Sequence, residues 1–140
     1  MRLEILNENH IDSILPIVSE VNHTLDAGII RQRLVEMFAH ANYRCFGLFD
    51  VSELIAVTSG WLLTKIYSGR QLELDNFAVA AHRRNDGVGK ILHEKVQQWA
   101  GENGFVSLEL NCYVSNSSAH KFYFNQGYSI IGYHFQKDTV

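Results

Sequence analysis

At 140 residues the chain has the length of one domain with a single hydrophobic core. Hydrophobic residues make up 46% and charged residues 19%, which is ordinary for a soluble globular protein. The net charge of -3 argues against a nucleic-acid-binding protein, and no apolar run approaches the length of a bilayer span. We expect one domain over residues 1–140, and a cytoplasmic protein because the N-terminal residues lack a signal-peptide pattern.

The periodicity of apolar residues predicts an alternation of strands and helices in the order β-α-α-β-β-β-α-β-α-β. These elements are expected at residues 1–6, 10–22, 26–41, 44–50, 54–67, 72–80, 88–100, 106–113, 116–127 and 128–137. Three strands in succession and two helical crossovers predict a mixed sheet in an α/β (α+β) domain. Six to seven strands with about four helices are expected, the seventh strand being short, fused to the sixth or missing.

One stretch, "AVAAHRRNDGVGKIL" at residues 78–92, joins the end of a strand to the start of a helix through a basic, glycine-containing loop. A helix N-terminus presents unpaired N–H groups and a positive dipole, and glycines let a ligand approach the backbone closely. The stretch fits neither common nucleotide loop, since Ile91 stands where a Walker loop needs Ser or Thr and Leu92 where the dinucleotide motif needs Gly. Alone, it is consistent with either an anion site or a plain tight turn.

A second stretch, "NSSAHKFYFNQGY" at residues 116–128, decides between these interpretations of the first. Together they resemble the acetyl-CoA-binding core of the GNAT superfamily of N-acetyltransferases, strongly over residues 72–128. The family patterns are V-x-x-x-x-[RQ]-x-x-G-x-[GA] and N-x-x-A-x-x-F-Y-x-x-x-G-[FY]. The residues in register are Val79, Arg84, Gly87, Gly89, Asn116, Ala119, Phe122, Tyr123, Gly127 and Tyr128.

The resemblance implies how acetyl-CoA, the expected co-substrate, is bound. Backbone N–H groups from Arg84 to Gly89 would hold the pyrophosphate, and one strand would pair with the pantetheine arm. The cofactor-binding residues so implied are Phe77, Ala78, Val79, Arg84, Asn85, Asp86, Gly87, Val88, Gly89, Lys90, Asn116, Lys121 and Tyr123. Asp86 departs from the family, which often has a basic residue there; it either opposes the phosphates or turns outward to cap the helix.

The same resemblance makes Tyr123 the general acid that protonates the leaving thiolate. The general base is expected to be Glu73 or Asp75, which lie two residues apart and thus on one face of a strand. Two neighbouring carboxylates could raise each other's pKa and attract a cationic amine. The alternatives are deprotonation through a water chain and, for both carboxylates, a plain solvated strand face.

The acceptor is open at this stage. Arg31 and Arg33 would suit an anionic amine, whereas Glu73 and Asp75 would suit a simple cation. Three functions are expected: N-acetylation of a small-molecule amine, acetylation of a protein N-terminus or lysine, or a catalytically silent acyl-CoA-binding sensor module.

The remaining expectations concern metals and partners. The seven histidines and two cysteines show no metal-ligand spacing, so no metal is expected. Neither a nucleic acid nor a membrane is an expected partner. A homodimer is expected, because a short last strand would leave a sheet edge open for pairing between subunits.

Overall fold

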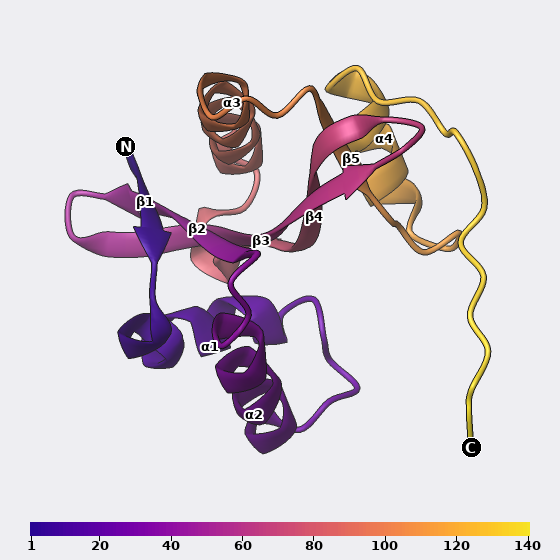
Figure 1. Cartoon of the computed structure of the whole chain (residues 1–140). Helices are drawn as coiled ribbons and strands as arrows, with labels where there is room; N and C mark the ends of the chain where they lie inside the picture. The colour runs from indigo at the N-terminus through magenta and orange to yellow at the C-terminus, as the bar shows by residue number, and fades with distance from the viewer. The chain divides into compact units, whose positions relative to one another are not determined.

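The computed structural model describes residues 1–140 and divides into two compact units, residues 1–110 and 111–140 (Figure 1). The first unit contains β1 (Arg2–Leu6), α1 (Ile11–Ser19), α2 (Ala27–Phe38), β2 (Tyr43–Asp50), β3 (Glu53–Lys65), β4 (Gly69–Val79), α3 (Val88–Glu102) and β5 (Ser107–Leu110), with single 3-10 turns before α1 and after β4. The second unit contains α4 (Ser117–Asn125). These elements follow the predicted order as far as α4.

The sheet has the strand order β1-β2-β3-β4-β5. The first four strands pair antiparallel, and β5 pairs parallel to β4 after the crossover through α3. The predicted mixed sheet is therefore confirmed. Two short turns make β2, β3 and β4 antiparallel neighbours, the long connection through α1 and α2 places β1 antiparallel to β2, and the crossover through α3 places β5 parallel to β4.

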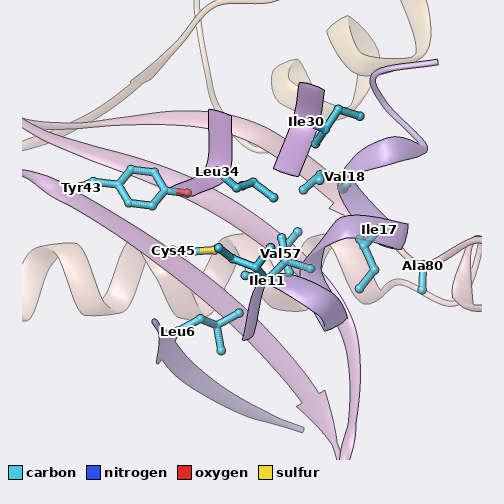
Figure 2. Close-up of a cluster of buried hydrophobic side chains, with 12 residues drawn as sticks. Leu6, Ile11, Ile17, Val18, Ile30, Leu34, Tyr43, Cys45, Val57 and Ala80 are labelled. Atoms are coloured by element: carbon cyan, nitrogen blue, oxygen red, sulfur yellow. The ribbon is translucent and has the colours of Figure 1, made fainter. Parts of the chain in front are cut away.

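Two hydrophobic clusters hold the first unit together, one on each face of the sheet. Helices α1 and α2 cover one face and α3 covers the other (Figure 1). Figure 2 shows the cluster beneath α1 and α2, where Val18 and Leu34 face the sheet residues Cys45 and Val57. On the opposite face, Val88, Leu92 and Val96 of α3 pack against the buried residues of β2 and β4.

A bulge in β4 changes which side chains face which helix. Val57 of β3 pairs with Ala78 and Ser59 pairs with Asp75, so two residues of β4, Asn76 and Phe77, oppose the single Thr58. Leu72 and Leu74 precede the bulge and pack in the α3 cluster; Phe77 and Val79 follow it and pack there too. The alternation therefore shifts by one residue at Asn76, whose φ of 50° is left-handed.

The last predicted strand is absent. Residues 128–137 were expected to form it, but the sheet has five strands, not six to seven, and residues 129–140 make no backbone hydrogen bond. The alternating apolar residues of this segment satisfy a strand pattern, yet a strand also needs a partner for its N–H and C=O groups. Ile130, Tyr133 and Phe135 are exposed. The expected strand at 106–113 is likewise shorter, since pairing with β4 ends at Leu110.

A buried glycine of β3 gives a test of this packing. A methyl group on Gly60 would lie 2.8 Å from Leu72 Cδ1 and 2.8 Å from Phe46 Cε2, both in the fully buried α3 cluster. Gly60→Ala should therefore lower the free energy of unfolding by about 1–3 kcal/mol, measured by urea denaturation. The control is Gly101→Ala, which meets no atom within 4 Å and should be neutral or stabilising by up to about 1 kcal/mol. Equal urea midpoints for the two variants would contradict this account.

Candidate functional site

The loop between β4 and α3 ends in backbone amides that the protein itself does not use. Gly87 is the N-cap residue, has a φ of 74° and contributes no side-chain cap. Asn85 also has a left-handed φ, of 66°. The first amide of α3 with an acceptor inside the helix is that of Ile91, which donates to Gly87 O at 3.2 Å. The N–H groups of residues 85–90 thus have no protein acceptor, an arrangement suited to bind an anion.

Arg83 anchors this loop to the hairpin of β2 and β3. Its guanidinium lies 2.9 Å from Asp50 Oδ2 and 3.6 Å from Glu53 Oε2, and its side chain is only 20% exposed. His82 contacts Glu53 as well. His82 and Arg83 therefore both pair with carboxylates of the hairpin. These pairs hold the loop, and with it the amides that follow.

The neighbouring charges are arranged differently. The Arg84 guanidinium donates to Glu20 Oε2 at 2.9 Å, and both side chains are exposed. Asp86 lies 4.0 Å from Arg83 Nε and does not cap α3. The alternative in which Asp86 caps the helix is therefore wrong, because Gly87 rather than Asp86 occupies the N-cap position.

The edge of β4 is open beyond its bulge. Strand β5 pairs with β4 only from Gln71 to Leu74, so no strand covers the β5 side of β4 from Asp75 to Val79. The stretch of Phe77, Ala78 and Val79 lies in this open part and leads directly into the loop before α3. A strand end that no neighbouring strand continues can pair with an extended ligand.

A cavity of about 270 Å³ lies beside the bulge, between α1, α2 and β4. Its polar lining consists of Asn22, Arg33, Asp75 and Asn76. Its apolar lining consists of Val18, Leu25, Ile30, Leu34 and Met37. A larger cavity of about 360 Å³ lies between β1 and α3 and is lined by none of the predicted site residues. The cavity at the bulge is the better candidate site, because the candidate base Asp75 lines it.

The two candidate carboxylates differ in their surroundings. Asp75 lines the cavity and accepts a 2.9 Å hydrogen bond from the Asn76 N–H. Desolvation raises the pKa of the Asp75 carboxyl above its usual value, and the Asn76 bond opposes the rise. The expected mutual effect of two carboxylates is not the cause of this shift. Glu73 lies outside the cavity lining, with its Oε2 4.0 Å from Lys65 Nζ.

The second unit carries the other motif on α4. Asn116 is the N-cap, and its Oδ1 accepts a 3.2 Å hydrogen bond from the Ala119 N–H. Tyr123 is half-buried, in edge-to-face contact with Phe122 at 5.3 Å and with Tyr128 at 5.5 Å. Lys121 is exposed on the same helix. The predicted helix and its cap are confirmed.

Sequence reasoning missed two residues that shape the cavity, Asn22 and Asn76. The Asn22 Nδ2 donates to Val18 O at 2.8 Å and to Asn76 Oδ1 at 3.2 Å, which ties the end of α1 to the bulge. A signal for the bulge was present, because the polar pair Asp75-Asn76 interrupts the alternation of "LELDNFAVA" and asparagine tolerates a left-handed φ.

Two further observations concern metals and membranes. The structure contains no group of three or more His, Cys, Asp or Glu side chains that could hold a metal ion. None of its helices combines the length and apolar character that a bilayer span requires.

Comparison with solved structures shows that the fold is shared at low sequence identity. The ribosomal-protein-alanine N-acetyltransferase from Brucella melitensis biovar Abortus 2308 superposes with a TM-score of 0.80 at 15% identity, over 98% of this chain and 98% of that chain. An aminoglycoside acetyltransferase from an uncultured soil metagenomic sample, in complex with sisomicin, gives a TM-score of 0.74 at 16% identity, over 98% and 96% of the two chains. At these identities the likeness concerns the fold alone.

Sequence comparison extends the likeness beyond the fold. An uncharacterized N-acetyltransferase from Bacillus subtilis (strain 168) is 28% identical over 123 residues, which cover 87% of this chain and 87% of that protein. The family model described as acetyltransferase (GNAT) family matches residues 13–128, which include the amide-bearing loop and the whole of α4. The chain therefore belongs to the acetyltransferase (GNAT) family.

Proposed function

We propose that this protein transfers the acetyl group of acetyl-CoA to the primary amine of a small molecule by direct attack on the thioester. The observation that carries the proposal is the row of unpaired amides at residues 85–90, at the start of α3 and in a member of an acetyltransferase family. Such a feature suits acetyl-CoA, because several N–H donors and the positive end of a helix dipole stabilise its pyrophosphate.

The cofactor would lie along the loop and the open edge of β4. The free amides from Asn85 to Gly89 would hold the pyrophosphate, with Val88 and Lys90 in the first turn of α3. The Arg84 N–H, which was expected to belong to this set, donates to Ala81 O at 3.5 Å instead. Phe77, Ala78 and Val79 would lie along the pantetheine arm, the place that the resemblance implies for them, beyond the point where β5 stops pairing with β4. One N–H of this stretch is the proposed donor to the thioester carbonyl oxygen, where negative charge develops. Asn116, Lys121 and Tyr123 are assigned by their places in the motif alone.

Asp75 is the proposed base that receives the proton of the ammonium group. It lines the cavity, and desolvation raises its carboxyl pKa toward the range useful for proton transfer. The neutral amine nitrogen then bonds to the carbonyl carbon, and the carbon–sulfur bond breaks. Tyr123 gives its proton to the departing thiolate, the role that its motif position implies, and the tyrosinate so formed is reprotonated by the second proton that the nitrogen loses as it becomes the amide. Glu73 is the less suitable base, because it does not line the cavity.

The size of the cavity favours a small acceptor over a protein. A volume of about 270 Å³ lies just below the range of about 300–1,000 Å³ for drug-sized ligands, so it suits a compact amine. No observation favours protein acetylation or a silent sensor module to the same degree. Thiol release across a panel of small amines and peptides distinguishes the three, because the sensor would bind acetyl-CoA without releasing thiol.

The cofactor loop is tested by Gly89→Glu. A carboxylate introduced among the free amides should abolish measurable binding of acetyl-CoA in isothermal titration calorimetry, because it occupies the anion position and repels the pyrophosphate. The matched control is Gly101→Glu on the same helix, where no atom lies within 4 Å of an added Cβ. If Gly89→Glu keeps wild-type affinity, the pyrophosphate does not bind at this loop.

The general acid is tested by Tyr123→Phe. Removal of the phenolic proton donor should lower kcat by about 10²–10⁴-fold while the Kd for acetyl-CoA changes by less than about twofold. Tyr113→Phe serves as the control, since Tyr113 is an exposed tyrosine of the same unit. An unchanged kcat in Tyr123→Phe would remove this residue from the mechanism.

The general base is tested by Asp75→Asn, which should lower kcat/KM by about 100-fold and also stabilise the fold at neutral pH. The stabilisation follows from the raised pKa of Asp75, because the charged carboxylate is less favourable in the folded state than in the unfolded chain. The readouts are thiol release and the thermal midpoint of unfolding.

The stabilisation by Asp75→Asn should depend on pH. Below the unfolded pKa both states are protonated, so the variant gains no advantage; as pH rises through the higher folded pKa, the wild type loses stability relative to Asn. The difference in midpoint should therefore shrink from about pH 8 to about pH 4. Glu73→Gln is the control on the same strand face. A difference independent of pH would contradict the assignment of Asp75.

A further inference from the structure

We propose that the acceptor is a small amine that also carries an anionic group, a carboxylate or a phosphonate, with Arg33 binding the anion and Asp75 facing the ammonium group. This inference rests on the proposed function and specifies its substrate class. It comes from the two opposite charges in the cavity between α1, α2 and β4, whose lining contains one cation and one carboxylate.

The cation of this cavity has no partner in the protein. Arg33 of α2 forms no ion pair and no side-chain hydrogen bond. Arg31, two residues earlier on the same helix, donates to Asp12 Oδ1 at 2.5 Å and does not line the cavity. Of the two arginines that suit an anionic amine, the structure thus separates one that is already paired from one that is free to bind a ligand.

Hydrogen bonds hold the part of β4 that carries Asp75. Thr58 Oγ1 donates to Asp75 O at 3.1 Å, and Asn22 Nδ2 donates to Asn76 Oδ1 at 3.2 Å. These bonds fix the bulge that presents the Asp75 carboxylate to the cavity. A carboxylate positioned in this way can orient an ammonium group before it takes up a proton.

Most of the remaining lining is apolar. Leu34 of α2 and Val18 of α1 are buried, and Met37 adds a flexible side chain that adapts to different shapes. Such a surface is suited to a short aliphatic spacer between the amine and the anion. The volume of about 270 Å³ leaves room for a compact molecule.

The same charges disfavour other amines. A diamine would place its second positive charge near Arg33, and like charges repel. A neutral amine or the N-terminus of a peptide would leave the guanidinium without an anion, so the contact that an anionic substrate gains would be absent. The preference among amines should therefore depend on the presence of an anionic group and not on the length of the carbon chain.

The experiment compares matched amines by thiol release and, independently of turnover, by saturation-transfer NMR of the amine with the whole protein. The anionic probes are β-alanine and aminomethylphosphonate; the comparison amines are β-alaninamide, propylamine, putrescine and an alanyl peptide amide. We expect the anionic probes to bind and to react with a kcat/KM about 10–100-fold higher than the others. The better of the two probes identifies the anion.

Two variants test whether Arg33 is the residue that binds the anionic group. Arg33→Gln should raise KM for the anionic probes about 10–100-fold, leave kcat nearly unchanged and leave β-alaninamide unaffected. Arg31→Gln removes the same charge from the same helix and should change neither KM nor kcat, since its exposed ion pair with Asp12 contributes little.

The outcomes separate this inference from the proposed function. Acetylation of amines without preference for an anion, or a preference that survives in Arg33→Gln, overturns the inference and leaves the transferase intact. Anionic amines that bind in an Arg33-dependent manner but release no thiol support the inference and overturn the proposed reaction. If no anionic amine binds and none reacts, the inference is wrong.

Discussion

The bulge of β4 at Asn76 is the feature on which the rest of the candidate site depends. Because two residues of β4 oppose the single Thr58, the alternation of side chains shifts, and residues on both sides of Asn76 can bury apolar groups against α3. The parallel pairing with β5 ends at Leu74, immediately before the bulge, so the following edge is open. Asparagine tolerates the left-handed backbone at position 76 better than most residues, and the bond from Asn22 helps to hold it there.

In the basic loop after β4, side chains fix the loop and the backbone amides are left available. Arg83 is largely buried against Asp50 and Glu53, so it fixes the loop, while the amides of residues 85–90 remain without protein acceptors. Val88, buried against the sheet, fixes the first turn of α3. Arg84 is held only by an exposed pair with Glu20, which contributes little and can be exchanged for a stronger anion.

Most of the fold could be predicted because its elements follow local rules. The helical spacing of residues such as Ile14, Val18 and Leu92 predicts the buried faces of α1 and α3, and each lies at or below 4% exposure. The expected strand at 128–137 failed because periodicity carries no information on whether a partner strand exists. The motifs correctly placed Gly87 and Asn116 at the starts of α3 and α4. The cavity was not predictable, because it arises from contacts between residues far apart in sequence.

Several features that do not help the fold to pack occur together at the cavity. A polar pair interrupts a strand at Asp75-Asn76, a non-glycine residue has a positive φ, a carboxylate is partly desolvated and an arginine on the adjacent helix lacks a partner. Each departure costs stability or gains none, and a ligand that carries both an ammonium group and an anion would compensate the two charges at once. Since these departures converge on one cavity beside the open edge of β4, selection for binding explains them better than selection for folding.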